Sequence, residues 1–104
     1  MAFIRACSYV CIIIPPEAPG AYSEVLVTFQ QDKMNVINKS LSDMTIDDGG
    51  FIVKLTQAET AKFSSPGCIK MQARCYASEY NVQGSEEWKI PVLPALNDTI
   101  LGGT

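Results

Sequence analysis

The chain of 104 residues contains no histidine, a single tryptophan and few charged residues, which make up 18% of the total. Without histidine there is no Ser-His-Asp or Cys-His arrangement, and no ordinary general base for catalysis near neutral pH. The Gly-Gly pairs at 49–50 and 102–103 indicate a turn and a tail, not a phosphate-cradling loop. Glu17, Glu86 and Glu87 are expected to be surface charges and not paired catalytic acids. The sequence therefore predicts a protein that is not an enzyme.

Basic residues are also few, and they are scattered along the chain without forming a cluster. The formal net charge is −3, from eight Lys and Arg against eleven Asp and Glu. Nucleic-acid binding requires gathered Lys and Arg, so a nucleic-acid partner is not expected. No apolar run approaches the roughly 18 residues of a membrane-spanning helix, so a membrane partner is not expected either. The length predicts one domain over residues 1–104, with 1–7 and 102–104 expected to fray.

Metal and disulfide chemistry would depend on four cysteines: Cys7, Cys11, Cys68 and Cys75. They form no C-x-x-C pair, and with no histidine available this argues against zinc; we expect no metal and no cofactor. The segment DMTIDDGG lacks the alternating acids and the distal glutamate of a calcium loop, so it predicts a solvated turn. Four free thiols acting as small hydrophobic residues are expected. Two disulfides in a secreted chain are the alternative.

The N-terminal stretch MAFIRACSYVCIIIPPEAPGA imitates a secretory signal, because an arginine precedes an apolar segment. Ser8 and Tyr9 interrupt the apolar part, and Pro15-Pro16 closes it. A first β-strand from Ser8 to Ile14 fits better, since β-branched residues favour strands and prolines cannot continue a ladder. We therefore expect that the chain is not secreted through a signal peptide.

Alternation of apolar and polar residues with a period of two is the strongest pattern in the chain. It is clearest in EVLVTFQQ (24–31), FIVKL (51–55), CIKMQARCYA (68–77) and EWKIPVL (87–93), and weaker in KMNVINKSL (33–41). Turn-forming segments separate these runs: PPEAPGAYS, QDK, DDGG, SSPG and EYNVQGSE. Such spacing predicts an all-β antiparallel sandwich of about seven to eight strands.

One segment interrupts the strand pattern with a short helical phrase, LTQAETAKF. Thr56 and Glu59 have the spacing of a capping box, in which each side chain bonds the backbone amide of the other residue. Phe63 is expected to point into the core, and SSPG then stops the helix. Because facing sheets lie roughly 10 Å apart, we expect this helix to carry the chain from one sheet to the other.

Aromatic residues offer the remaining candidates for a binding surface. Trp88 alternates with Ile90 and Val92, which predicts a place in the core, although an exposed tryptophan can also stack on a sugar. Pro91 in the same strand implies an edge position or a bulge. Tyr76, Tyr80 and Trp88 together are the residues that we expect to form an interaction surface, if the aromatic side chains gather.

The order of these motifs resembles a family of small proteins from phages and prophages of Gram-positive bacteria. The resemblance covers about residues 22 to 101, in the pattern L-T-Q-x-E-T-x-x-F, then G-x-[IV]-x-x-Q-x-R, then a serine loop, a strand and a closing L-N-D-x-I-L. The matching positions are Gln30, Leu55, Thr56, Gln57, Glu59, Thr60, Phe63, Gly67, Gln72, Arg74, Ser85, Leu96, Asn97 and Asp98.

The resemblance implies an immunoglobulin-like sandwich that serves as a virion structural protein of the tail, baseplate or capsid surface. Its partners would be other virion proteins and copies of itself, and it would be assembled in the bacterial host cytoplasm without enzymatic activity. Two alternatives stand beside it. One is a ligand-binding or adhesin module for a host-surface carbohydrate, with Trp88 and the tyrosines clustered. The other is a secreted, disulfide-bonded immunoglobulin-like domain.

Overall fold

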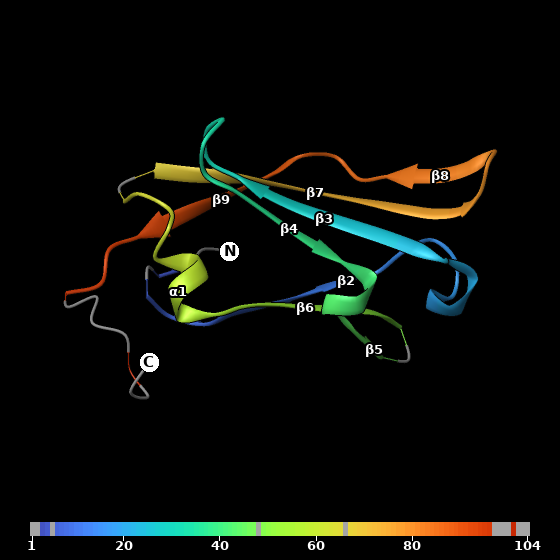
Figure 1. The fold of residues 1–104 in the computed structure, drawn as a ribbon, viewed down its shortest axis with the longest axis horizontal. Coiled ribbons are helices and arrows are strands. Elements are labelled where there is room, and N and C mark those ends of the chain that lie inside the picture. Colours follow the sequence, from blue (N-terminus) through green and yellow to red (C-terminus); the bar gives the residue numbers. More distant parts are fainter. Residues whose placement is uncertain (1–2, 5, 48, 66, 97–100, 102–104) are drawn as a thin grey trace.

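The computed structural model describes residues 3–4, 6–47, 49–65, 67–96 and 101, and it shows two β-sheets packed face to face (Figure 1). The larger sheet contains β1 (Phe3–Ile4), β3 (Glu24–Gln30), β4 (Val36–Ser40), β7 (Gly67–Ser78), β8 (Asn81–Gly84) and β9 (Trp88–Leu93). The smaller sheet contains β2 (Tyr9–Ile13), β5 (Thr45–Asp47) and β6 (Gly50–Leu55). The all-β sandwich predicted from the sequence is confirmed, with nine strands in the described part instead of seven to eight.

Strand order identifies the sandwich as immunoglobulin-like. The larger sheet runs β1-β9-β7-β3-β4, with β8 also paired to β7, and the smaller sheet runs β2-β6-β5. The order β9-β7-β3-β4 corresponds to strands G-F-C-C′ of the immunoglobulin fold, and β2-β6-β5 corresponds to B-E-D. Each pair along these orders is antiparallel except β1 and β9, whose described residues run parallel. An immunoglobulin domain of antibodies joins B to F by a disulfide; here the Cys11 sulfur of β2 lies 4.0 Å from the Met71 sulfur of β7.

The core follows the period-two pattern. Along β3, β6, β7 and β9 the buried positions are those that the alternation placed on one face, and the following residues are less than 9% exposed: Val25, Val27, Phe29, Phe51, Val53, Leu55, Ile69, Met71, Ala73, Cys75, Ile90 and Val92. Burial of one aliphatic or aromatic side chain of this size stabilises the fold by about 1.5–3 kcal/mol, before the entropic cost of ordering the side chain is subtracted. Trp88 departs from the expectation, because it is 40% exposed.

Two hairpins form where turn residues predicted them. β3 pairs with β4 through residues 31–35, where the Asp32 carboxylate accepts hydrogen bonds from the Met34 and Asn35 amides at 2.8 Å each. This side-chain turn delays the second strand to Val36, three residues later than the predicted start at 33. β5 pairs with β6 at the DDGG segment, although Asp48 lies outside the described residues. Gly50 is required there, since an added Cβ would lie 2.5 Å from the Ile13 carbonyl oxygen.

Two segments differ from their predicted state. Residues 79–86 were expected to form only a connection, but β8 lies within them and pairs with the second half of β7. Residues 1–7 were expected to fray; among them, Phe3 and Ile4 pair with Val92 and Leu93 of β9. Ala6, in a left-handed conformation with φ of 62°, then turns the chain from the larger sheet toward β2. Residues 102–104, which were also expected to fray, lie outside the described residues.

A short helix carries the chain between the sheets, as predicted. α1 (Gln57–Thr60) follows β6 of the smaller sheet and precedes β7 of the larger one, at one end of the sandwich (Figure 1). Two 3₁₀ turns, η1 (Pro19–Ala21) and η2 (Leu41–Asp43), lie in two further connections that leave one sheet for the other, in addition to the segment between β1 and β2. A tight two-residue hairpin cannot span the distance between facing sheets, so each of these crossings needs a longer connection.

Candidate functional site

The helical corner is held by the capping box that its sequence predicts. The Thr56 hydroxyl accepts a hydrogen bond from the Glu59 amide at 3.2 Å, and the Thr56 amide donates to Glu59 Oε1 at 2.9 Å. Lys39, at the end of β4, adds an ion pair to Glu59 Oε2 at 2.7 Å. Burial raises the pKa of Glu59, but the hydrogen bonds from Lys39 and Thr56 outweigh it and hold this pKa below its ordinary value.

The inner side of the corner is packed against the rest of the sandwich. Phe63 is fully buried, as the sequence predicts. Thr60 is also fully buried, and its hydroxyl donates to the Cys7 carbonyl oxygen at 2.8 Å, which fastens the segment before β2 to the helix. Thr56, Glu59, Thr60 and Phe63 therefore have structural roles at this corner. Lys39 was not predicted, because twenty residues separate it from Glu59 and only the sandwich brings them together.

The aromatic residues expected to form one interaction surface are not brought together. Tyr76 lies on the outer face of β7 and is 37% exposed, while Trp88 shares the inner face of β9 with Ile90. Tyr80 is 94% exposed in the turn between β7 and β8. Trp88 and Tyr76 thus point to opposite faces of the same sheet. A sugar platform built from both side chains has no geometric basis in this arrangement.

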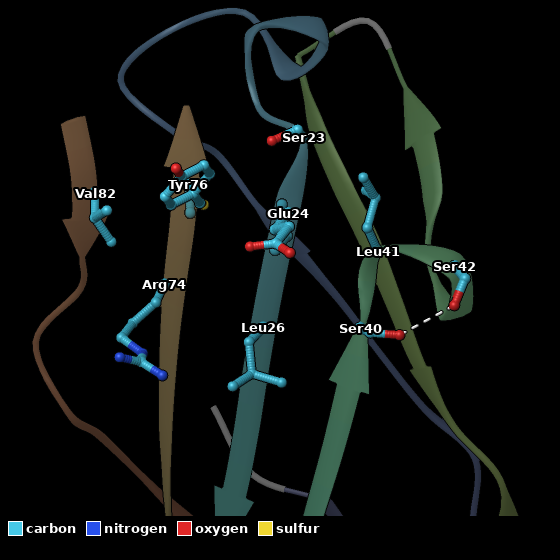
Figure 2. A pocket seen from close by; sticks show the side chains of 11 residues that line it. Ser23, Glu24, Leu26, Ser40, Leu41, Ser42, Arg74, Tyr76 and Val82 are labelled. Atoms are coloured by element: carbon cyan, nitrogen blue, oxygen red, sulfur yellow. Dashed lines mark hydrogen bonds between the residues drawn. The ribbon is translucent and has the colours of Figure 1, made fainter. Parts of the chain in front are cut away.

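An open hollow of about 610 Å³ lies on the larger sheet, between β8, β7 and β3 and the start of η2 (Figure 2). Arg74 and Tyr76 project from β7, beside Leu26 and Glu24 of β3, and Val82 of β8 closes one side. The wall on the other side comes from the segment of Ser40 and Ser42, whose hydroxyl oxygens are 3.0 Å apart. The hollow combines apolar side chains with one guanidinium and one carboxylate. The described residues that line it include no pair of groups suited to acid–base or nucleophilic catalysis.

A second cavity, of about 570 Å³, opens between the two sheets beside β2, and we call it the edge cleft. One wall is formed by the end of β2 and the residues after it, from Ile12 to Pro16. The floor is the inner face of β7 at Met71, Ala73 and Cys75, and the far wall includes Trp88. Unlike the outer hollow, it is lined mainly by aliphatic, aromatic and sulfur-containing side chains. Its chemistry is suited to contact with apolar side chains.

Two of the four cysteines line the edge cleft. Cys11 and Cys75 are buried and Cys7 and Cys68 are exposed, and all four are free, as the sequence predicts. Burial raises the pKa of the Cys11 thiol and of the Cys75 thiol above the ordinary value. A thiol in this state is protonated at neutral pH and is a poor nucleophile. The two sulfur atoms therefore contribute soft apolar surface to the cleft, and not reactivity.

The edge of β2 is unusual for the exposed edge of a sheet. No strand among the described residues pairs with its free side, and no charged residue occurs from Ala6 to Pro16. Val10, Ile12 and Ile14 are 56%, 57% and 77% exposed. Soluble proteins usually protect such an edge with lysine, a bulge or a covering loop. Among the described residues, only Pro15 and Pro16 limit its length. We call the free side of β2, together with these three side chains, the β2 edge. The alternation of apolar and polar residues predicted the strand, but only the order of the strands in the sheet shows that one side of it is free.

In the part of the chain that the structure describes, no group of three or more Cys, Asp or Glu side chains is arranged to hold a metal ion. No helix among the described residues has the length and apolar character needed to cross a bilayer. Asn97 and Asp98, two positions of the phage-like sequence pattern, lie outside the described residues. Comparison of the chain with protein-family models, with curated proteins and with solved structures finds no match.

Proposed function

We propose that the chain is a non-enzymatic structural protein of a phage or prophage, carried in the virion as part of the tail, baseplate or capsid surface. It works through contacts with other virion proteins and with copies of itself, and it is assembled in the cytoplasm of the bacterial host. The sequence pattern from residue 22 to 101 supports the viral origin, and the all-β sandwich is the fold that this resemblance implies.

The observation that carries the proposal is the β2 edge. An uncharged strand with a free backbone edge and three exposed aliphatic side chains is a template for pairing with another chain. A protein that worked alone in solution would gain nothing from exposing it and would risk aggregation. In an assembled particle, the same edge is covered by a neighbouring subunit. The exposed apolar residues therefore support a role in assembly.

The state of the cysteines also supports assembly in a reducing compartment. Cys11 lies beside Met71 and not beside a second cysteine, and the four thiols are free. Disulfides form mainly in oxidising compartments, and cytosolic proteins keep their thiols reduced. The sandwich builds its core without covalent cross-links, which is the condition that a protein assembled in the bacterial cytoplasm must meet.

The proposal is tested on phage particles from a host that carries this sequence in an inducible prophage. Particles are purified through a density gradient, and each fraction is quantified by mass spectrometry against the major capsid protein. The chain is expected at a constant ratio to the capsid protein across the particle peak. An abundant host ribosomal protein is quantified in the same fractions, and its level measures contamination of the particles by host proteins. Recovery of the chain only in the particle-free lysate contradicts the proposal.

A further inference from the structure

We propose that the edge cleft accepts one extended segment of another protein, which adds as a strand to the β2 edge. Its backbone pairs with β2, and every second side chain enters the cleft toward Met71 and Trp88. Strand addition of this kind draws affinity from main-chain hydrogen bonds and specificity from alternate side chains. The inference rests on the proposed function, because it names the kind of segment through which the chain joins a neighbouring virion protein.

In the part of the chain that the structure describes, the arrangement of the sheets leaves one strand position open beside β2. The contact between Cys11 and Met71 places β2 over β7, so β8 and the Trp88 end of β9 extend past β2 by about one strand spacing, ~5 Å. In the immunoglobulin fold a first strand lies beside strand B on this side. Here the first strand, β1, pairs with β9 instead. The edge cleft is therefore as wide as a single strand, with β2 ready to pair on one side.

The lining of the cleft defines the chemistry of the segment. Among the described residues that line it, Lys89 is the only charged one, and the adjoining β2 edge carries no charge at all. A charged side chain pointing inward would be desolvated without a partner, which is strongly unfavourable. The segment must therefore have uncharged apolar residues at its inward positions, and an acidic residue is favoured only at the end beside Lys89. Flexible Met71 and the two buried thiols allow the floor to adapt to aliphatic side chains of different shape.

Direct pairing of β2 with β2 of a second copy does not fit this position. In such a dimer, β2 of each copy would pair antiparallel with β2 of the other, about a two-fold axis perpendicular to the sheet. Both larger sheets would then lie on the same side of the two joined smaller sheets. The parts of β8 and β9 that extend past β2 would then collide with their counterparts. A single extended segment avoids this collision, because it adds only one strand width. Because the first and last described strands of this chain, β1 and β9, already pair with each other, the occupant that the geometry favours is a strand or tail of a different protein.

The experiment selects the segment from a library of random nine-residue peptides displayed on ribosomes, using the purified full chain as bait. Enriched peptides are expected to alternate apolar residues with other residues, to lack internal proline and to lack inward charge. Trp88 is the sole tryptophan and lines the cleft, so its fluorescence reports occupancy. Binding of an enriched synthetic peptide should reduce acrylamide quenching of Trp88 by at least about twofold. Failure to enrich any peptide above the library background overturns the proposal.

Two variants with matched exposure locate the binding site. Ile12 on β2 is 57% exposed and Ile46 on β5 is 55% exposed, so a lysine at either position should leave the fold intact. Circular dichroism checks this for both. Ile12→Lys places a charge on the β2 edge and should weaken peptide binding at least about tenfold. Ile46→Lys, at the opposite edge of the smaller sheet, should change it less than about twofold. Equal effects of both variants, or no effect of either, overturn the proposal.

Backbone methylation of the peptide distinguishes strand addition from simple apolar contact. In an added strand, alternate amides face β2 and the remaining amides face away. N-methylation of one alternate set should therefore weaken binding at least about tenfold, while methylation of the other set is tolerated. If both sets are tolerated, or both abolish binding, strand addition is wrong. Dimerisation of the free chain that Ile12→Lys prevents would overturn the choice of occupant.

These results separate the inference from the proposed function. If the chain is present in particles but takes up no peptide strand, only the inference fails. If peptides bind as expected but the chain is absent from particles, the virion role fails while the strand-accepting cleft stands.

Discussion

The helical corner allows a stability prediction with a well-defined magnitude. Phe63 is fully buried after α1, so Phe63→Ala removes a large side chain from a site that the surrounding sheets cannot easily close. Truncation of a buried phenylalanine to alanine costs about 3–5 kcal/mol, which is a large fraction of the 5–15 kcal/mol that stabilises a typical domain. At about 4 °C per kcal/mol for a domain of this size, the Tm should fall by about 12–20 °C.

The measurement is thermal unfolding followed by circular dichroism, with urea unfolding to give the free energy directly. Tyr80→Ala is the matched control, because it also truncates an aromatic side chain but at a position that is 94% exposed. Its effect should stay within about 0.5 kcal/mol. If Phe63→Ala lowers the Tm by no more than Tyr80→Ala does, the side chain is not part of the core. The assigned packing of the corner would then be wrong.

Three further predictions concern the capping box and the thiols. Thr56→Ala should lower the free energy of unfolding by about 0.5–2 kcal/mol, because the Glu59 amide loses its acceptor; an unchanged urea midpoint would contradict the cap. The pKa of Glu59 is lowered in the folded state, so its contribution to stability is complete above the unfolded pKa near 4.3 and is lost as the pH falls through the folded pKa. Urea midpoints measured from pH 6 to pH 3 should therefore fall more steeply for the native chain than for Glu59→Gln, and parallel curves would refute the assignment. A thiol reagent such as Ellman's should label two cysteines quickly in the folded chain and all four after denaturation without reductant, whereas a secreted disulfide-bonded domain would show none; the fast pair should be Cys7 and Cys68.

Local patterns were sufficient to predict most of the sandwich. Alternation in β3, β6 and β7 assigns each side chain to a face, because a strand has no other period. The Asp-Gly turn and the Thr56–Glu59 capping box act over two to four residues, so they too are visible in the sequence. β8 was missed because its four residues include only one large apolar side chain, Val82, which is 51% exposed. That strand forms as the return arm of a hairpin with β7, and burial contributes little to it.

The candidate site lay beyond these local rules. Its walls come from residues 11–16, 71–75 and 83–90, and only the order of strands in the two sheets brings them to one cleft. The face of Trp88 was predicted correctly by its alternation with Ile90, yet its exposure depends on how far the smaller sheet reaches across β9. The Lys39–Glu59 ion pair likewise depends on where β4 ends relative to α1. Such features are properties of the assembled sandwich, which no single segment encodes.

The length of β7 has a consequence for how the protein is made. This strand of twelve residues pairs with β3 on one side and with β8 and β9 on the other. A nascent chain leaving the ribosome at about 5–20 residues per second must wait for residue 78 before the larger sheet has its central member. Until then β3 and β4 form only a two-stranded part of the larger sheet, and a hairpin without further strands is marginally stable in water. The larger sheet therefore forms only after β7 has been synthesised, and the interval before it favours capture by chaperones.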